Sequence, residues 1–328
     1  MADVSRRFQE LSPERRQLFE QLRRAKAVSE ATTRLEQAAP ADFHHTVTPQ
    51  HVGRLELAIN PSRSSEDVKH NFRRFYNEVS KQLDSSLVGQ FSYFLNYGYL
   101  PDGSPEYAAV KLPEKYINKN SVKLVLELIG DCDLKGHRIL DVGCGRGGTI
   151  YTIQQFFRPA TMMGIDLSAN AIQFCNRVHR YPGVGFREGD AERLPFADSS
   201  FDVVTNVESS HTYPNIRSFF IEAYRVLTTG GFFLYTDVMP REKSTECLGM
   251  LRHVGFTVEK DRDITKNVVL SCNEIAASRA QVFQSGNDDQ LVNNFLAAPG
   301  SQVYEEMRSG AWIYRICRLR KEPSKPGA

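Results

Sequence analysis

The sequence predicts an α/β fold in which a mostly parallel sheet carries helices on both faces. From about residue 120 onward, short apolar segments alternate with amphipathic helical segments, as they do when helices connect the strands of a parallel sheet. The apolar segments are also continuous, which is typical of strands that are buried on both faces. Ahead of this region, residues 65–84 carry apolar side chains at helical spacing, which predicts a helix with one buried face.

Each element follows from a local pattern. Ser64 and Asp67 flank the start of the helix 65–84. Gly98 and Pro101 prevent a long helix in the aromatic segment that follows. Strands are expected at 137–143, 161–166, 184–190, 201–207, 230–238 and 311–320. Helices are expected at 121–130, 148–157, 169–180, 215–227 and 244–253, and the polar stretch 264–308 is expected to be helical.

The composition is that of an ordinary globular protein. Of 328 residues, 41% are hydrophobic and 24% are charged, which excludes a collagen-like or coiled-coil chain. The net charge of +2 gives no sign of a nucleic-acid or anionic membrane partner. The longest apolar runs are too short to span a bilayer, and no secretory signal is expected, because no apolar run follows the basic pair Arg6 and Arg7. Six scattered cysteines without a CxxC pair favour a reducing, cytoplasmic location over a disulfide framework.

The strongest motif is ILDVGCGRGG at residues 139–148, between an expected strand and an expected helix. Gly143, Gly145 and Gly148 satisfy the pattern GxGxxG, whose glycines permit a tight turn and a close approach of a ligand to the backbone. Alone, this pattern indicates a dinucleotide site. Asp141 ends the strand before the first glycine, where a carboxylate can order the loop and meet an ammonium group.

Two further acidic positions favour a different nucleoside. Asp166 ends the next strand, where a carboxylate can accept hydrogen bonds from both ribose hydroxyls. The segment GDAERLPF at 189–196 follows the third strand, where Asp190 can accept from an adenine amino group and Ala191 can offer its backbone. A nicotinamide-binding domain, the alternative, has no use for this segment.

In this order, the motifs resemble those of the class I S-adenosylmethionine (SAM)-dependent methyltransferases over about residues 120–328. The turn LTTGGFF before the fifth strand completes the set. The resemblance implies SAM as the cofactor, a Rossmann-like seven-stranded sheet and an N-terminal helical cap or lid. It also implies a cofactor site that includes Asn96, Tyr97, Tyr99, Asp141, Gly143, Cys144, Gly145, Asp166, Leu167, Asp190, Ala191 and Asn206.

The segment NYGY at 96–99 precedes the sheet, and in this superfamily such a segment covers the cofactor. Tyr97 and Tyr99 can present an aromatic face or a hydroxyl to the sulfonium. The alternative is that these rings form the core of a small helical cap.

A histidine and a glutamate leave the fourth strand in NVESSHTYP at 206–214. Ligands of an open parallel sheet bind at the carboxyl ends of its strands, so His211 is expected near the reacting methyl group. An imidazole suits the general base for an alcohol or a phenol. A loop histidine that only bonds to the backbone is the alternative. Glu208 is expected to orient the imidazole, contact the substrate or cap the following helix.

The sequence of residues 164–238 is similar to the sequences of two groups of enzymes within this superfamily. One group is the phthiotriol-type lipid O-methyltransferases, and the other is the O-methyltransferase domains of polyketide and mixed polyketide–nonribosomal peptide synthases. Two further segments of this chain, FSYFLNYGYL at 91–100 and LPEKYINKNSVKLVLELIGD at 112–131, resemble the second group. In those enzymes a histidine after strand four, with a glutamate, activates a hydroxyl without metal. This resemblance implies that His211 and Glu208 are the catalytic residues.

The function expected is O-methylation of a polyketide-like hydroxyl, free or tethered to a carrier protein, in secondary metabolism. The alternatives are C-methylation of an isoprenoid or lipid, and a non-catalytic SAM-binding module. No metal is expected, because Asp237 stands alone after the fifth strand.

Four segments are expected along the chain. Residues 1–40 form a helical arm, which either docks onto a synthase or a second copy, or packs on its own domain. Residues 41–118 form a linker and a helical cap over the cofactor. Residues 119–260 form the SAM-binding core, and residues 261–328 form a helical lid insertion and the final strands.

Overall fold

The computed structural model describes residues 64–85, 91–103, 107, 110–113, 116, 118–283 and 290–322. The expected N-terminal arm, residues 1–40, lies outside these residues, as does most of the linker that follows it. Among the helices of the described ranges, none is both long and apolar enough to cross a membrane.

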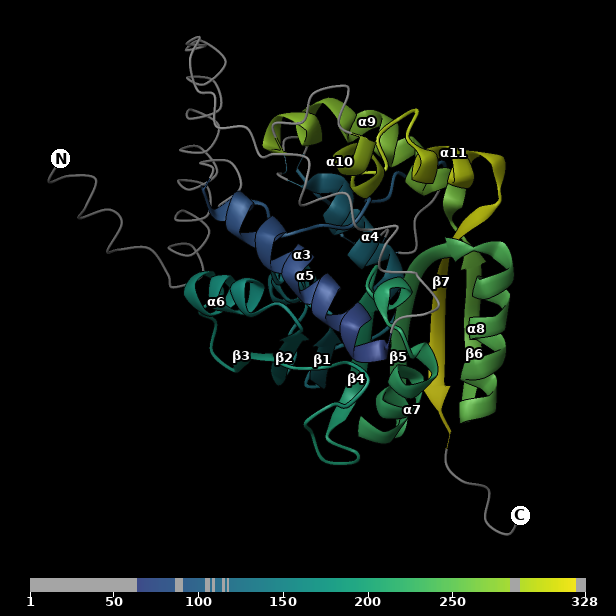
Figure 1. Ribbon diagram of the computed structural model, residues 1–328. Helices are drawn as coiled ribbons and strands as arrows, with labels where there is room; N and C mark the ends of the chain where they lie inside the picture. The colour runs from purple at the N-terminus through teal and green to yellow at the C-terminus, as the bar shows by residue number, and fades with distance from the viewer. Residues whose placement is uncertain are drawn as a thin grey trace, which may run out of the picture. The chain divides into compact units, whose positions relative to one another are not determined.

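The described residues contain a seven-stranded sheet in the order β3-β2-β1-β4-β5-β7-β6 (Figure 1). Strands β1 to β5 run parallel, and β7 runs antiparallel to both of its neighbours. The predicted α/β class is therefore confirmed. The strands are β1 (Arg138–Val142), β2 (Thr161–Asp166), β3 (Val184–Glu188), β4 (Phe201–Val207), β5 (Leu227–Pro240), β6 (Phe256–Asp263) and β7 (Trp312–Lys321).

Helices cover both faces of this sheet. Ile139 of β1 packs into an apolar cluster with α4 and α5, whereas its neighbour Leu140 packs into a second cluster with α7 and α8. This division follows from the alternation of side chains along a strand. The helices of the described residues are α3 (Ser65–Ser85), α4 (Lys119–Ile129), α5 (Gly148–Phe156), α6 (Ala169–Val178), α7 (Ile216–Val226), α8 (Arg241–Val254), α9 (Thr265–Phe283), α10 (Gln290–Phe295) and α11 (Gln302–Ser309).

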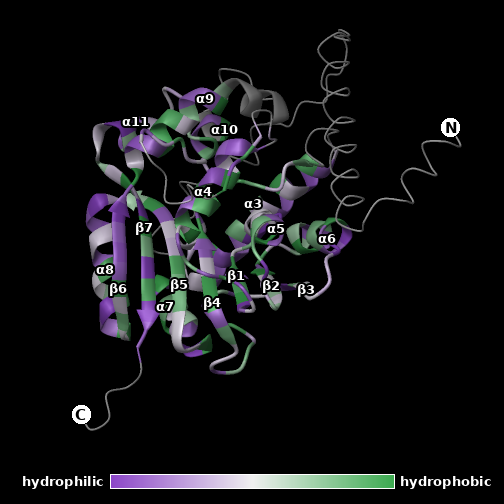
Figure 2. Cartoon of the chain, turned by 180° about the vertical axis from the view of Figure 1, so that it is seen from behind, coloured by the Kyte–Doolittle hydropathy of each residue, from purple (hydrophilic) through white to green (hydrophobic). Residues whose placement is uncertain are grey.

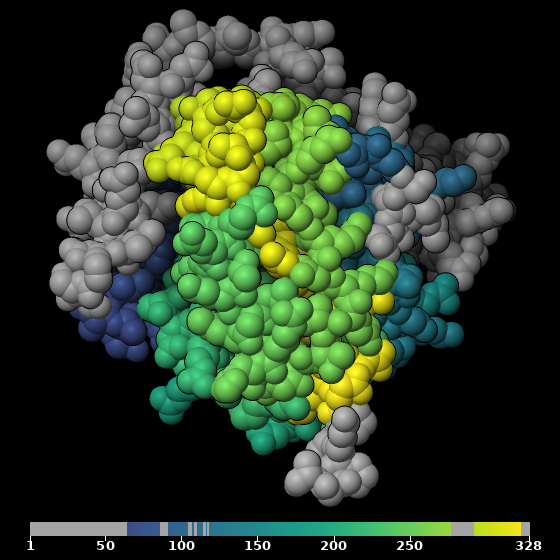
Figure 3. Space-filling model, turned by 90° about the vertical axis from the view of Figure 1, so that its right-hand side faces the viewer, coloured from purple at the N-terminus to yellow at the C-terminus, as the bar shows by residue number. Residues whose placement is uncertain are grey.

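Strand β6 was not located by the sequence patterns. Its sequence FTVEKDRD is mainly hydrophilic (Figure 2), because β6 lies at the edge of the sheet and alternates between exposed and partly buried side chains. Pairing with β7 supports it, aided by ion pairs such as Arg320 to Glu259. Figure 3 faces this edge, where the side chains of α8 and β6 leave only parts of β7, in yellow, visible.

Helix α3 is tied to the loops that follow β1, β2 and β3. The Lys69 Nζ lies 2.7 Å from Asp190 Oδ2 and 2.7 Å from Glu192 Oε2, in the loop after β3. The Asn77 Oδ1 accepts from Ser168 Oγ, after β2, at 2.8 Å. At the far end of the helix, Asp84 binds a guanidinium from the loop after β1. The carboxyl ends of three strands thus lie beneath α3.

Candidate active site

The glycine turn begins where β1 ends. The backbone at Gly143 has φ of +69°, and a Cβ there would lie 2.0 Å from Ser209 Oγ, so only glycine fits. Gly145 also has a positive φ, of +50°, but a Cβ there would meet nothing within 4 Å. Gly145 therefore borders open space, as a residue beneath a ligand would. Both glycines, together with Cys144, line one pocket.

Asp166 holds this turn from the end of β2. Its Oδ2 accepts from the N–H of Gly145 at 2.8 Å, and its Oδ1 accepts from the N–H of Ser168 at 2.8 Å. Burial raises the pKa of Asp166, while these backbone N–H groups act in the opposite direction. Asp166 and Leu167 line the pocket, and the binding of a ribose by Asp166 stays a prediction.

The loop after β3 also reaches the pocket through Asp190 and Ala191. Both carboxylate oxygens of Asp190 already have partners, because Oδ2 pairs with Lys69 and Oδ1 accepts from the N–H of Glu192 at 2.9 Å. The predicted bond from Asp190 to an adenine amino group stays a prediction.

Three residues expected at the cofactor lie behind the pocket lining. Asp141 is buried, and its Oδ1 accepts from Thr205 Oγ1 at 2.7 Å. Asn206 braces β4 against β1 by donating to the Val142 carbonyl at 2.8 Å. Within the described residues, Asp141 Oδ2 and Asn206 Oδ1 are buried acceptors that have no hydrogen-bond partner. Burial raises the pKa of Asp141 to about 7.

Tyr99 is the third of these residues, and its side chain lies in the core, as the alternative given for this segment expects. Gly98, with φ of +78°, turns the chain, and Tyr99 is buried among apolar side chains. Its hydroxyl donates to Glu127 at 3.2 Å. Asn96 and Tyr97, on the other side of the turn, do line the pocket.

His211 lies on the short helix η4 (Ser210–Thr212) and is held by the end of β5. Its Nδ1 lies 2.7 Å from Asp237 Oδ1, while Asp237 Oδ2 accepts from the backbone N–H of His211 at 2.9 Å and from Ser210 Oγ at 2.6 Å. A carboxylate that receives so many donors accepts from the imidazole too, so Nδ1 carries the proton. The neutral ring then presents Nε2 as its basic nitrogen.

The electrostatics of this pair suit proton transfer. Burial lowers the pKa of His211, but the charge and hydrogen bond of Asp237 outweigh burial and raise the pKa above its usual value. His211 remains one-third exposed and lines the pocket, whereas Asp237 is 1% exposed. Asp237 was considered in the sequence only as a metal ligand. Its place at the end of a parallel strand, like that of Asp166, is the signal that could have found it.

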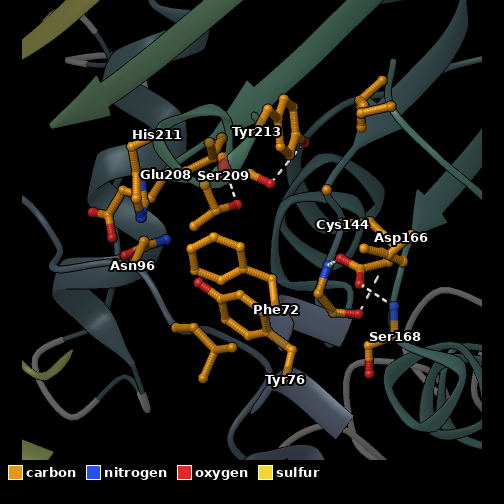
Figure 4. Close-up of a pocket in the computed structure, with 18 of the residues that line it drawn as sticks. Phe72, Tyr76, Asn96, Cys144, Asp166, Ser168, Glu208, Ser209, His211 and Tyr213 are labelled. Atoms are coloured by element: carbon orange, nitrogen blue, oxygen red, sulfur yellow. Dashed lines mark hydrogen bonds between the residues drawn. The ribbon is translucent and has the colours of Figure 1, made fainter. Parts of the chain in front are cut away.

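Glu208 joins three parts of the chain instead of holding the Nδ1 of His211. Its backbone has a left-handed φ of +47°. Its Oε1 accepts from the N–H of Tyr97 at 2.7 Å and from the hydroxyl of Tyr314 on β7. Glu208 also lines the pocket beside His211 (Figure 4). Its predicted catalytic role is not tested by this arrangement.

The glycine turn, Asp166, Glu208 and His211 line one pocket of about 420 Å³, a size typical of small-molecule sites. Aromatic rings of α3, Phe72 and Tyr76, enter it from the side opposite the sheet (Figure 4). The sequence patterns assigned both rings only to the buried face of a helix. Further apolar side chains come from β5, α10, α11 and β7, namely Val238, Met239, Phe295, Val303 and Trp312.

The residues in and around this pocket fit SAM as a ligand. The two orphaned acceptors, Asp141 Oδ2 and Asn206 Oδ1, lie in the strands that carry the glycine turn and the histidine loop. Gly145 leaves an open cradle above the turn. The carboxylates of Asp166 and Glu208 line the pocket and favour a ligand with cationic groups. Among the described residues, no group of three or more His, Cys, Asp or Glu is arranged to hold a metal ion.

Comparisons with known proteins decide the family. The sequence profile described as "Methyltransferase domain" matches residues 140–235. A fatty-acid O-methyltransferase of Mycolicibacterium smegmatis is 37% identical over 225 residues, which cover 68% of this chain and 81% of the relative. The chain belongs to the class I SAM-dependent methyltransferases. A phthiotriol/phenolphthiotriol dimycocerosates methyltransferase of Mycobacterium tuberculosis is 36% identical over 277 residues, covering 79% of this chain and 95% of the relative.

Solved structures of the same fold are more distant from this methyltransferase in sequence. The [4+2]-cyclase SpnF superposes with a TM-score of 0.60 at 21% identity, covering 77% of this chain and 96% of the cyclase. A geranyl diphosphate methyltransferase in complex with GPP and sinefungin has a TM-score of 0.57 at 20% identity, covering 77% and 99%. These likenesses establish the fold. The acceptor must be inferred from the side chains of the pocket.

Proposed function

We propose that this methyltransferase methylates a hydroxyl group on an acyl chain of the polyketide or fatty type, with His211 as the general base. The observation that carries the proposal is the pair formed by His211 and Asp237, 2.7 Å apart, at the wall of a largely apolar pocket. A hydroxyl must lose a proton when it is methylated, and an oriented neutral imidazole removes one.

SAM supplies an activated methyl group on a positively charged sulfur. The residues of the chain supply the rest. The turn at Gly143 and Gly145, with Asp166, would hold the nucleoside. Asp237 keeps the proton of His211 on Nδ1, so that Nε2 is the atom that receives a proton from the acceptor. Alignment of the reacting groups contributes about 7–11 kcal/mol to such reactions, and a positioned base about 10²–10⁴-fold in rate.

The apolar side of the pocket supports an acyl substrate. Met239, Phe295 and Trp312 come from three elements and line the same cavity as His211. An aliphatic chain packed against them would exclude water from the reacting hydroxyl. The names of the relatives, a fatty-acid O-methyltransferase and a phthiotriol/phenolphthiotriol dimycocerosates methyltransferase, are compatible with such a chain.

Two other acceptors make different demands on the site. A fatty-acid carboxylate is already ionised at neutral pH and needs no base, so the His211–Asp237 pair would be superfluous. Carbon methylation of an alkene depends on aromatic side chains that stabilise a cation, and Phe72 and Tyr76 give this alternative some support. With either of these acceptors, loss of the His211 imidazole should lower the rate of methyl transfer much less than it does with a hydroxyl.

Three matched acyl chains test the proposal. One carries a β-hydroxyl, one has only its terminal carboxylate and one carries an internal alkene. All three are tested as free acids, and the first and third are also tested as thioesters on a carrier protein. After incubation with methyl-labelled SAM, mass spectrometry locates the label. We expect a methyl ether on the hydroxylated chain, and comparing the free acid with the carrier-bound form identifies the form that is used. Label confined to the carboxylate or to carbon contradicts the proposal.

A further inference from the structure

Helix α3 brings two aromatic rings into the middle of the pocket. Phe72 and Tyr76 are one helical turn apart, and their ring centroids lie 6.5 Å apart with an interplanar angle of 26°. In Figure 4 the rings lie between two groups of side chains, with His211 and Glu208 on one side and Asp166 on the other. The ring pair therefore borders the space between the cofactor loops and the base.

The charges around Tyr76 locate its ring more closely. Burial is the main reason that the pKa of Tyr76 is raised, and the carboxylates of Asp166, Asp237 and Glu208 raise it further. These carboxylates come from the ends of β2, β5 and β4. The side chain of Tyr76 thus lies within electrostatic range of both halves of the site. An aromatic ring among carboxylates is the environment that proteins use for cationic ligands.

We propose that the Phe72–Tyr76 pair is the aromatic wall that faces the positively charged sulfur of bound SAM, with Tyr76 in contact with the cofactor. The inference rests on the cofactor and not on the proposed acceptor. It adds α3 to the role that the sequence suggested for Tyr97, which also lines the pocket, and Tyr99, whose ring is buried in the core.

Neighbouring side chains hold Tyr76 in its position on α3. Phe295 of α10 packs edge-on against Phe75 at 5.5 Å and against Tyr76 at 6.5 Å between ring centroids. Lys69 and Asn77, on either side of Tyr76 along α3, bind the loops after β3 and β2. A ring held on both sides in this way loses little conformational freedom when the cofactor arrives.

The test compares SAM with S-adenosylhomocysteine, which has the same nucleoside and amino-acid groups but a neutral sulfur. Calorimetry without any acceptor measures the affinity of the full chain for each. The variants are Tyr76→Leu, which removes the ring, and Tyr76→Phe, which keeps it. Phe75→Leu is the matched control, because Phe75 belongs to the same aromatic cluster but does not line the pocket.

We expect Tyr76→Leu to weaken the binding of SAM by about 2- to 30-fold, the range of a cation–π contact. The binding of S-adenosylhomocysteine should be weakened much less. Tyr76→Phe and Phe75→Leu should preserve the preference for SAM. Equal weakening of both ligands by Tyr76→Leu, or no weakening, overturns the proposal. Thermal unfolding of each variant identifies a misfolded one, and in that case the preference is measured with Tyr76→Met. Because no acceptor is present, a failed base assignment leaves this result unaffected.

Discussion

The two halves of the pocket are built in different ways. On the cofactor half, a backbone bond from the Gly145 N–H to Asp166 holds the turn after β1, and one helix, α3, binds the loops after β1, β2 and β3. On the acceptor half, the loop after β4 depends on distant partners. Glu208 binds Tyr97 and Tyr314, which are 111 and 106 residues away in the chain.

This difference separates a general function, cofactor binding, from a specific one, the selection of the acceptor. A turn made of backbone groups binds the cofactor whatever the acceptor is, and many acceptors are compatible with it. Side chains from several remote elements, by contrast, select the acceptor and its chemistry. Changes on the cofactor half should therefore alter SAM binding, whereas changes on the acceptor half should alter the rate and its dependence on pH.

The largest effect is expected for His211→Ala. Loss of a positioned base should lower kcat by about 10²–10⁴-fold while SAM affinity stays within about twofold, because His211 lies on the acceptor half. Steady-state kinetics and calorimetry measure the two quantities. His253→Ala, at an exposed histidine of α8, is the control and should match the unaltered chain. If His211→Ala no longer binds SAM, the proposal that the two halves of the pocket have separate functions is contradicted.

The complementary change on the cofactor half is Gly143→Ala. The new Cβ would meet Ser209 Oγ at 2.0 Å in a backbone with positive φ, so we expect SAM affinity to fall by more than about tenfold. Gly230→Ala is the matched control, because Gly230 also has positive φ, of +81°, but its Cβ would meet nothing within 4 Å. If both variants bind SAM equally well, the fit of this turn has no importance for the cofactor.

The pH profile should move when Asp237 is changed. The imidazole acts as a base only when neutral, so kcat/KM should rise with pH through the pKa of His211, which Asp237 holds above about 6.5. In Asp237→Asn the raising charge is gone, and the rising limb should shift to lower pH while the plateau rate decreases. If the rising limb of kcat/KM has the same midpoint in Asp237→Asn as in the unaltered chain, a group other than His211 titrates there.

The smallest effect is expected at the contact between α3 and the loop after β3. Lys69→Met removes the ion pairs of Lys69 with Asp190 and Glu192. The loop after β3 is also held by its own backbone bonds, such as that from the Arg193 N–H to the Asp190 carbonyl, so SAM affinity should fall by no more than about fivefold. Lys266→Met, which removes a more exposed pair with Asp102, is the control. A loss as large as that expected for Gly143→Ala would make α3 a primary determinant of cofactor binding.

The sequence patterns identified what local chemistry determines. Continuous strands and the glycine turn located β1 to β5 and most of the cofactor half, including Asp166 and Leu167. They missed β6, whose polar sequence depends on pairing with β7, and they missed Asp237, whose partner lies 26 residues away. They also did not distinguish Tyr97, which lines the pocket, from Tyr99, which is buried in the core, because a segment of alternating aromatics does not reveal which ring a glycine turn directs into the core.

The central claim is that His211 removes a proton from a hydroxyl, and acceptors of graded acidity test it most directly. Single-turnover rates would be measured for the unaltered chain and for His211→Ala with a β-hydroxyacyl substrate and with its fluorinated analogue, whose hydroxyl is more acidic. Because a more acidic hydroxyl needs less help from a base, the defect of His211→Ala should be about 10²–10⁴-fold for the first acceptor and much smaller for the second. Equal defects for both acceptors would contradict the account.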